Sequence, residues 1–399
     1  MTQWKQAQKP SFLASSLLER LDFGRPFLTA QPTRRQPARC DATRWGRDLS
    51  YFMESAAVSE SPANVRELDE QICRPSQEVV QAIDQCPGAI TVLGAGGKMG
   101  YHVCRMLQLA LTELGREGEL LAVSRFGAAG SEAKFADSGI ATLATDLSDP
   151  AQVEHVPVTP NAFFLAGIKF GTSARGDLLR RMNETMPRLV ANHFVGSRMV
   201  VMSTGCVYSF ADPAAGGSTE QDPTDPPGEY AQSCLAREHA FTTASMRDGT
   251  PSVLVRLNYS IDLRYGVLVD LAQQLLHDHP IPLDTGYVNV IWQGDAVQQI
   301  IRCLPRVASP PLILNVTGPE TYAVRDLACR LANRMGKEPQ FEGTEAPRCW
   351  LNNSKLATEM YGPPKVSIDQ MIEWTADWIT RGGPTLNKPT HFQNRDGNY

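Results

Sequence analysis

The stretch Ala89-Ile-Thr-Val-Leu-Gly-Ala-Gly-Gly-Lys-Met-Gly100 decides the fold of this chain. It begins as an apolar run with the character of a buried strand and ends in closely spaced glycines, and residues 101–111 continue with helical periodicity. A second apolar run, Glu119-Leu-Leu-Ala-Val-Ser-Arg125, follows at the distance that a strand, helix, strand unit requires. The sequence therefore predicts an α/β fold built on a doubly wound parallel sheet.

The glycines indicate a phosphate site at the first turn of that unit. Gly94, Gly97 and Gly100 are spaced three apart, and they suit a tight turn, a close backbone approach to a pyrophosphate and close packing of helix on strand. The N-terminus of the helix that follows offers amide groups to an anion. The alternative is a glycine-rich turn that holds no ligand. The residues predicted to bind a dinucleotide here are Gly94, Gly96, Gly97, Lys98, Met99 and Gly100.

The end of the second strand bears on which dinucleotide is bound. An acidic residue there would bind the 2′-hydroxyl of the adenosine ribose, but this chain has Ser124 and Arg125, which suit a 2′-phosphate. NADP is therefore favoured over NAD, unless Arg125 is simply a solvated side chain at a strand end.

Two later strands continue the pattern. Residues 141–147 predict a third strand that ends with Asp146 and Leu147 near the adenine ring. Residues 161–167 predict a fourth, buried strand whose last residues, Ala166 and Gly167, leave room for a cofactor, and Lys169 follows it.

The order of these features resembles a known family. It comprises the glycine turn, Asp146-Leu147, Ala166-Gly167, Val200-Val-Met-Ser-Thr-Gly-Cys-Val-Tyr208, Tyr230 and Arg256-Leu-Asn258. Over roughly residues 88 to 380 the chain is similar to the extended short-chain dehydrogenase/reductases of the NAD-dependent epimerase/dehydratase family. The resemblance implies a Rossmann domain, a smaller C-terminal α/β substrate lobe, sugar or nucleotide-sugar substrates and a homodimer.

The resemblance also implies catalytic roles and exposes one departure. Thr204, beside Ser203, matches the hydroxyl that polarises the substrate, and Tyr230 matches the general acid/base, but Cys234 stands where the family has a lysine. A cation about 4 Å from a phenol contributes on the order of 4 kcal/mol at an effective dielectric near 20, or roughly three pKa units. Without such a cation Tyr230 would be a weak base near neutral pH.

Four groups could replace the missing lysine. Lys169 could reach across from the fourth strand, Arg237 lies on the same helical face, and an oxidised nicotinamide is itself positive. The thiol of Cys234 could carry a proton, because its ordinary pKa lies closer to neutrality than that of a phenol. The alternative is that Cys234 packs as a small apolar side chain.

The substrate side is less defined by sequence. Asn258 is expected on the nicotinamide side and Tyr259 toward the substrate. The remaining predicted substrate ligands are Ser203, Asn289, Trp292 and Gln293; the alternative for the last three is a packing role within the protein. Asp295 is expected to cap a helix. No metal site is predicted, because His277 and His279 lack a third spaced ligand.

Composition limits the class of protein. The chain has 399 residues with a net charge of −5 and no dense basic run, which argues against nucleic acid as a partner. It has no apolar run of about 18 residues that would span a membrane. Nine cysteines without a CxxC pair indicate reduced thiols and a cytoplasmic location.

Four segments are expected along the chain. Residues 1–85 form an N-terminal extension, partly disordered and then helical; its basic start resembles a targeting peptide, but Glu19 and Asp22 argue against that. Residues 86–260 form the nucleotide-binding domain and 261–380 the interleaved substrate lobe. Residues 381–399 form a tail, either an arm over the lobe or a partner subunit, or disordered.

The function predicted from these observations is NAD(P)-dependent redox chemistry, epimerisation or dehydration of a sugar or related polyhydroxylated molecule. Two alternatives remain open. The chain could bind NAD(P) as a sensor or structural ligand without catalysis, or it could be a non-redox lyase or isomerase in which Tyr230 and Thr204 move protons.

Overall fold

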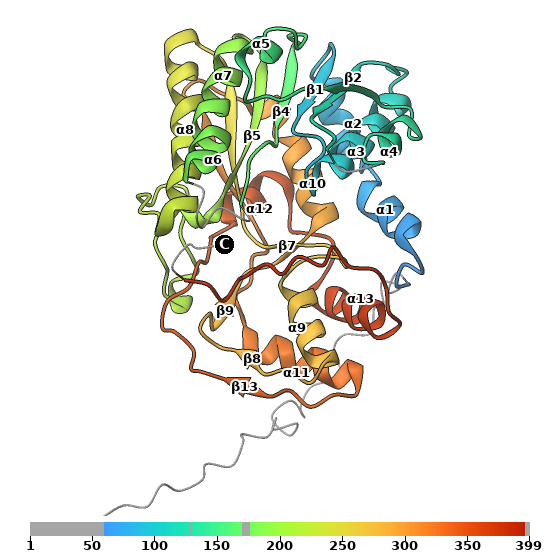
Figure 1. Cartoon of the computed structure of the whole chain (residues 1–399), viewed down its shortest axis with the longest axis vertical. Helices are drawn as coiled ribbons and strands as arrows, with labels where there is room; N and C mark the ends of the chain where they lie inside the picture. Colours follow the sequence, from blue (N-terminus) through green and yellow to red (C-terminus); the bar gives the residue numbers. More distant parts are fainter. Residues whose placement is uncertain (1–59, 128–129, 170–175, 396–399) are drawn as a thin grey trace, which may run out of the picture. The chain divides into compact units, whose positions relative to one another are not determined.

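The strand before the glycines is β1 (Ile90–Leu93), and all four of its side chains are buried. It lies between β4 and β2 in a seven-stranded sheet of order β11-β6-β5-β4-β1-β2-β3, in which every pairing is parallel (Figure 1). Parallel strands covered on both faces are apolar along their whole length, and β1 follows this rule. The predicted doubly wound sheet is confirmed. The other strands are β2 (Leu120–Ser124), β3 (Ala141–Ala144), β4 (Asn161–Phe164), β5 (Arg198–Thr204), β6 (Ser252–Leu257) and β11 (Leu312–Val316).

The structure, a computed structural model, describes residues 60–127, 130–169 and 176–395. Most of the predicted N-terminal extension lies outside these residues. The part that is described contains the helices α1 (Val65–Cys73) and α2 (Gln77–Asp84).

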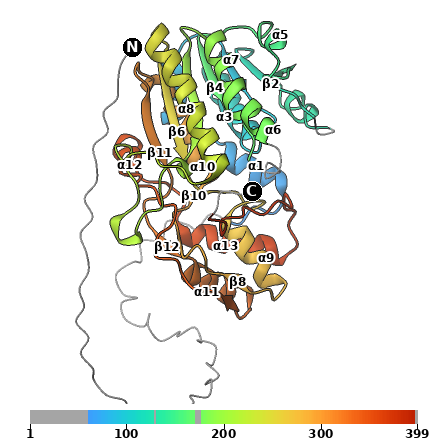
Figure 2. The same cartoon turned by 60° about the vertical axis from the view of Figure 1, so that its left-hand side comes forward.

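Helices cover both faces of the sheet. Ile90 and Val92 pack into an apolar cluster with α2, α3 (Gly100–Glu113) and α10 (Gln293–Arg302). Leu93 points the other way, into a cluster with α7 (Met186–His193) and α8 (Gly228–Asp248), which lie side by side (Figure 2). This alternation follows from the two-residue repeat of a strand. Shorter helices are α4 (Ala133–Ala136), α5 (Pro150–Val153), α6 (Gly176–Arg180) and α12 (Lys355–Tyr361).

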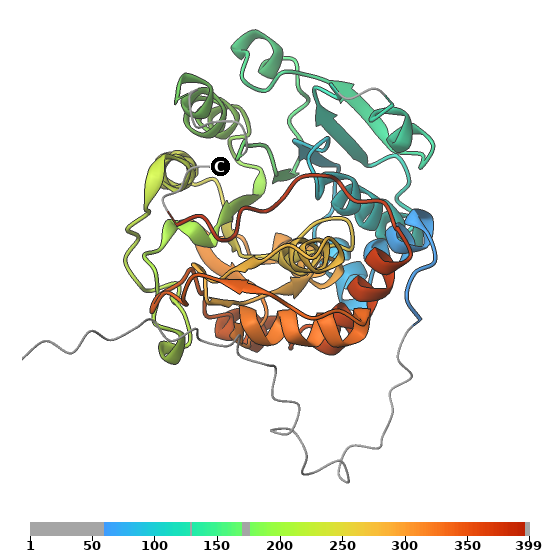
Figure 3. The same ribbon diagram turned by 60° about the horizontal axis from the view of Figure 1, so that its bottom comes forward.

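A smaller lobe forms around a second apolar core. The helices α9 (Val267–Leu276), α11 (Val324–Met335) and α13 (Ile368–Thr380) pack on one another (Figure 3). Trp374 and Trp378 of α13 are buried in the core of this lobe. Because β11 returns to the main sheet after α9 and α10, the lobe and the sheet interleave along the chain. The lobe and its junction with the sheet also contain short paired strands: β7 (Ser260–Ile261), β8 (Ile281–Pro282), β9 (Tyr287–Val288), β10 (Ile291–Trp292), β12 (Tyr322–Ala323) and β13 (Phe341–Glu342).

Two local expectations need correction. Strand β3 ends at Ala144, so Asp146 and Leu147 stand in the loop beyond it. Asp295 does not cap a helix, because α10 already begins at Gln293 and Asp295 lies in its first turn. Its carboxylate instead accepts a hydrogen bond from the backbone amide of Val366, 2.9 Å away, which ties α10 to the segment before α13.

The described cysteines are mostly free and buried. The free thiols are Cys73, Cys86, Cys104, Cys206, Cys234, Cys303 and Cys349, whereas Cys329 is disulfide-bonded. The expectation of reduced thiols is therefore wrong for Cys329. Among the described residues, no helix combines the length and the apolar character that a membrane crossing needs.

Candidate functional site

Three adjoining cavities open at the carboxyl ends of the strands, beside β1 and β4. At this point the chain leaves β1 toward β2 on one side of the sheet order and leaves β4 toward β5 on the other. This is the position at which doubly wound sheets bind ligands. The Arg125 cavity has a volume of about 390 Å³, the glycine cavity about 580 Å³ and the Tyr230 cavity about 200 Å³. Gly94, Gly96 and Gly97 line the first two, and Lys169 and Tyr230 line the last two. Each cavity therefore shares lining residues with the next, and the three form one continuous series.

The positions in the turn need glycine for different physical reasons. Gly94 has a φ of +89°, and a Cβ there would lie 2.5 Å from the backbone nitrogen of Ala166. A Cβ on Gly100 would lie 2.1 Å from the carbonyl oxygen of Ala95, so α3 could not start so close to β1. These two glycines are required by the fold itself.

Gly97 is different, because the protein does not crowd it. A Cβ on Gly97 would meet only the carbonyl oxygen of Gly94, at 3.3 Å, and its φ is not in the left-handed region. A side chain at Gly97 would therefore occupy the cavity that Gly97 lines. The missing side chain at Gly97 leaves room for a bound group. A pyrophosphate held against the turn and the N-terminus of α3 fits this position. The residues present thus fit a bound dinucleotide.

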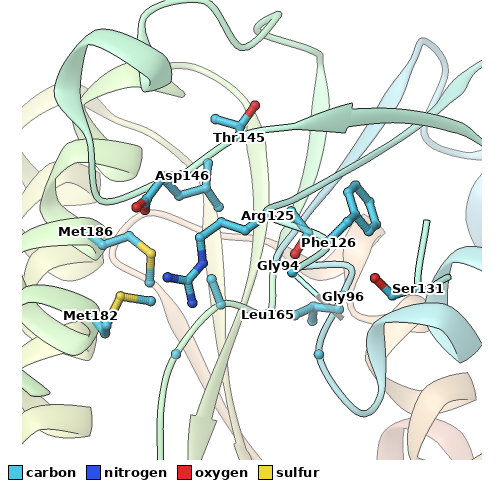
Figure 4. Close-up of a pocket in the computed structure, with 16 residues that line it drawn as sticks. Gly94, Gly96, Arg125, Phe126, Ser131, Thr145, Asp146, Leu165, Met182 and Met186 are labelled. Carbon is cyan, nitrogen blue, oxygen red and sulfur yellow. The ribbon is translucent and has the colours of Figure 1, made fainter. Parts of the chain in front are cut away.

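Arg125 extends into the middle of the first cavity (Figure 4). Asp146, Met182 and Met186 lie on one side of its guanidinium group, and Phe126 on the other (Figure 4). Ser124 and Leu147 also line this cavity. The two methionines and the phenylalanine offer apolar surface to a flat ring, and Arg125 offers a cation beside it.

The carboxylate of Asp146 has partners within the protein. It accepts hydrogen bonds from the amide and hydroxyl of Ser148, at 2.9 and 2.6 Å, and it lies 3.4 Å from Arg181. Although burial raises its pKa, these hydrogen bonds and the nearby Arg125 and Arg181 hold the pKa below its ordinary value. Asp146 is therefore a fixed negative charge at the wall of the Arg125 cavity.

The small residues after β4 serve two purposes. Ala166 and Gly167 both line the Arg125 cavity, as predicted. A Cβ on Gly167 would also lie 2.2 Å from a guanidinium nitrogen of Arg237. Gly167 therefore makes room for Arg237 as well as for a ligand.

Thr204 and Tyr230 line the same cavity, as the sequence predicts. The hydroxyl oxygen of Thr204 accepts from the amide of Cys206 at 3.2 Å, which leaves its proton for donation into the cavity. Ser203 also lines this cavity, but its hydroxyl donates to Glu238 at 2.5 Å. Glu238 in turn forms a buried bidentate pair with Arg256, at 2.9 and 2.6 Å. Ser203 thus takes part in the network that fixes α8 against β5 and β6.

Cys234 stands one turn after Tyr230 on α8, and Tyr230 packs against the apolar cluster that contains Cys234. Burial raises the pKa of Tyr230 well above its ordinary value, Cys234 and Cys206 raise it further, and Arg237 lowers it. Burial also raises the pKa of the Cys234 thiol. These directions disfavour Cys234 as a proton acceptor near neutral pH and leave Tyr230 in need of a cation.

Two of the predicted cations are near Tyr230. The ammonium nitrogen of Lys169 lies 5.8 Å from the centroid of the Tyr230 ring and donates to the carbonyl oxygen of Thr390 at 3.4 Å. Arg237 is buried and donates to the carbonyl oxygen of Met202 and to Asn183, at 3.0 and 2.7 Å. Burial lowers the pKa of Lys169, and the nearby Cys206, Cys234 and Asp270 oppose that effect.

The structure divides the predicted substrate ligands. Tyr259 and Gln293 line the Tyr230 cavity with Asn258, and Tyr259 has a strained φ of 38°. The structure does not bring Asn289 and Trp292 to this cavity. Both are almost fully buried: Asn289 bonds to Glu320, Thr321 and Asn352, and Trp292 packs on Trp374 at a centroid separation of 5.2 Å. The sequence around Asn289 and Trp292 did not show whether their side chains face the cavity or the core.

Sequence reasoning missed several lining residues. Asp262, Tyr265 and Thr390 line the Tyr230 cavity, and Lys388 lines the glycine cavity. Lys98 lies over the ring of Tyr265, 3.1 Å from its centroid. None of these lobe and tail residues stands in a recognisable pattern. Within the described ranges no group of three or more His, Cys, Asp or Glu residues could hold a metal ion.

Comparison with known families agrees with this geometry. Residues 90–260 match the model of the NAD dependent epimerase/dehydratase family, so the resemblance predicted from the motifs is confirmed. The match includes the glycine turn, Thr204, Tyr230 and Asn258. No curated protein sequence matches the chain.

Solved structures share the fold at low sequence identity. UDP-glucose 4-epimerase of Thermus thermophilus, in complex with NAD, is 20% identical with a TM-score of 0.61, over 74% of this chain and 99% of that one. UDP-glucuronic acid 4-epimerase of Bacillus cereus, in complex with UDP-glucuronic acid and NAD, is 17% identical with a TM-score of 0.61, over 73% and 99%. UDP-glucose 4-epimerase of Thermotoga maritima, with UDP-glucose, is 16% identical with a TM-score of 0.61, over the same shares.

Proposed function

We propose that this protein is an NAD(P)-dependent enzyme that oxidises, epimerises or dehydrates a sugar or related polyhydroxylated molecule. The observation that carries the proposal is the shared lining of the cavities: Tyr230 stands on the same cavity as the glycine turn, and Thr204 on the next. A nicotinamide beside these residues would accept a hydride from a substrate carbon. The family match over residues 90–260 supports the same class of reaction.

The roles of the protein side chains follow from their protons. Thr204 donates its hydroxyl proton to a substrate oxygen and so holds that oxygen toward Tyr230. The phenolic oxygen of Tyr230 takes the proton of the substrate hydroxyl when the carbon is oxidised and returns it in the reverse direction.

Lys169 is proposed to replace the lysine of the family pattern. It lies on the glycine and Tyr230 cavities together with Tyr230. Arg237 is the other candidate, and it lowers the pKa of Tyr230. Both cations also donate hydrogen bonds within the protein, Arg237 to Met202 and Asn183 and Lys169 to Thr390. The positive charge of an oxidised nicotinamide would add to the effect of Lys169.

We propose a preference for NADP over NAD, on the strength of Arg125 and Ser124. Arg125 extends into the cavity in which an adenosine ribose would lie, and a 2′-phosphate would pair with it. The Thermus and Bacillus epimerase structures contain NAD, which favours the opposite preference. The selectivity therefore depends on Arg125.

The substrate class is proposed by likeness. The solved epimerases with the same fold act on or bind UDP-sugars, and the Tyr230 cavity offers hydroxyl and amide groups from Thr204, Asn258 and Gln293 that suit a polyol. A cytoplasmic homodimer, with a nucleotide-binding domain at 86–260 and a substrate lobe at 261–380, completes the proposal. Sedimentation of the purified protein tests the dimer.

The function is tested by following nicotinamide absorbance at 340 nm while UDP-glucose, UDP-glucuronic acid and free sugars are added with NAD⁺ or NADP⁺. The proposal expects reduction, or conversion of the sugar without net reduction, with at least one substrate. Tyr230→Phe is expected to bind the cofactor normally and to lose turnover. Full turnover by Tyr230→Phe would show that α8 is not catalytic.

A second candidate function is favoured by one observation. The pKa of Tyr230, which burial raises, describes a tyrosine that is held protonated. A protein that only binds NAD(P), as a sensor or structural ligand, would tolerate such a tyrosine. Binding of the cofactor without conversion of any sugar would favour this candidate, whereas elimination or isomerisation without the cofactor would favour a non-redox lyase.

A further inference from the structure

The C-terminal segment 385–395, here called the C-terminal strap, crosses from the lobe to the cavities (Figures 1 and 3). Before the strap begins, the indole nitrogen of Trp378 donates to the carbonyl oxygen of Pro384 at 3.0 Å. Within the strap, the amide of Leu386 donates to the carbonyl oxygen of Arg264 at 2.9 Å. The first part of the strap is therefore fixed to α13 and to the loop after β7.

The middle and the end of the strap are fixed as well. The amide and hydroxyl of Thr390 donate to Asp270 of α9, at 2.8 and 2.6 Å. Phe392 is buried in the lobe, and its carbonyl oxygen accepts from Thr285 at 3.0 Å. Arg395 lies over the ring of Phe210, 4.2 Å from its centroid. These contacts hold the backbone on both sides of Lys388.

Lys388 lines the glycine cavity together with Gly94, Gly96 and Gly97. It is exposed, and it forms no hydrogen bond or ion pair within the described part of the chain. A long side chain loses conformational entropy when it is held at one place, and contacts must offset that loss. For Lys388 the described part of the protein supplies no hydrogen bond or ion pair that would do so. Its backbone is nevertheless fixed by Leu386 and Thr390.

The charge of the glycine cavity has one sign. Its lining residues include Lys98, Lys169, Arg237 and Lys388, and none of the lining residues is an Asp or Glu. Burial, together with the neighbouring charges of Lys169 and Lys388, lowers the pKa of Lys98 to about 7, against the opposing effect of Asp270 and Asp262. A dianion in the cavity would relieve this repulsion.

We infer that Lys388 binds the pyrophosphate of the dinucleotide, so that the C-terminal strap closes the cofactor site from the side opposite the glycine turn. This inference rests on the proposed function, because it takes the ligand of the glycine turn to be a dinucleotide. The turn supplies amide groups from α3, and Lys388 supplies a mobile cation from the tail. A strap held partly by the ligand itself would be more ordered when the ligand is bound.

The test compares Lys388→Met with Lys355→Met. Lys355 is an exposed lysine of α12 whose charge partner is Glu359, 3.7 Å away, so its removal is a matched loss of charge away from the cavities. Dissociation constants are measured by calorimetry for NAD⁺, ADP-ribose and adenosine. Lys388→Met is expected to weaken NAD⁺ and ADP-ribose about five- to tenfold and to leave adenosine unchanged, and Lys388→Arg is expected to recover most of the loss.

A second readout follows the strap directly. Amide hydrogen exchange in residues 385–395 is expected to slow when NAD⁺ is added to the wild type, and to slow less in Lys388→Met. Equal dissociation constants for Lys388→Met and Lys355→Met would overturn the inference while leaving the proposed function intact. If the wild type bound neither NAD⁺ nor ADP-ribose, the proposed function and this inference would fail together.

Discussion

The two ends of the cavity series differ in how the protein builds them. At the glycine turn, the geometry comes from consecutive residues of one strand, turn and helix, and the spacing of Gly94, Gly97 and Gly100 is enough to specify it. At Tyr230, the lining residues come from β5, α8, the loop after β6, the start of α9 and the C-terminal strap. The difference teaches that a phosphate site can be local in sequence, whereas a catalytic site is assembled from distant segments.

The two ends also differ in how far they follow the family pattern. The glycine turn has every glycine of the family pattern. A Cβ on Gly97 would meet only one atom of the protein, so the fold alone does not require a glycine there. The Tyr230 end lacks the lysine of α8 and has the uncharged thiol of Cys234 in its place. Binding and catalysis should therefore separate in mutants, and the predictions below use that separation.

The largest expected effect is at the glycine turn. Gly97→Asp places a side chain and a negative charge in the position proposed for the pyrophosphate, so binding of NAD⁺ and NADP⁺ should fall below detection. The fold should survive, because a Cβ at this position meets only one atom of the protein. Calorimetry measures the binding and circular dichroism the fold. Unchanged affinity would refute the dinucleotide site.

The next effect is on turnover alone. Lys169→Met should lower kcat at least about a hundredfold and move the limb of the pH profile that reports Tyr230 to higher pH, because Tyr230 loses a nearby positive charge. Adding Cys234→Lys to this variant should restore activity if both positions act on one phenol. Lys355→Met is the control. Arg237→Met would not serve as a control, because Arg237 is buried and its hydrogen bonds stabilise the fold.

If Lys169→Met kept its rate and its pH profile while Tyr230→Phe was inactive, the cation would have to be the cofactor itself. That outcome would place the whole electrostatic requirement at the nicotinamide. Measuring both variants under saturating cofactor separates this case from a loss of binding.

A smaller effect concerns selectivity. Arg125→Ala should weaken NADP⁺ by about 1 to 3 kcal/mol, the range for charge-assisted hydrogen bonds, and should barely change NAD⁺. Competition binding of the two dinucleotides gives the ratio. A similar loss for both would mean that Arg125 packs on the adenine and does not contact a 2′-phosphate.

The smallest effect is a pH dependence of binding. Because the pKa of Lys98 is about 7 in the free protein, the side chain is protonated at pH 6 and largely neutral at pH 8.5. An anionic ligand favours the protonated form, so the dissociation constant for NAD⁺ should rise about threefold or more between these pH values. Lys98→Met should bind NAD⁺ weakly at both. A wild-type affinity that is flat with pH would show that Lys98 keeps its proton.

The sequence predicted the sheet well because a parallel sheet covered on both faces has apolar strands that are read directly, as in β1. It also placed Thr204 and Tyr230 on one cavity, because the family resemblance covers both. It gave no sign of Lys388 or Tyr265, which reach the cavities through the packing of the tail and lobe. Asn289 and Trp292 were expected at the substrate and are instead buried, since a short strand does not reveal which face meets the cavity.

The most direct test of the central claim is a crystal structure of the protein grown with NADP⁺ or NAD⁺. The account predicts the adenosine beside Arg125, the pyrophosphate against Gly97 and the nicotinamide within reach of Tyr230. A dinucleotide bound elsewhere, or a nicotinamide that points away from Tyr230 and Thr204, would contradict the claim that one site binds the cofactor and moves the proton.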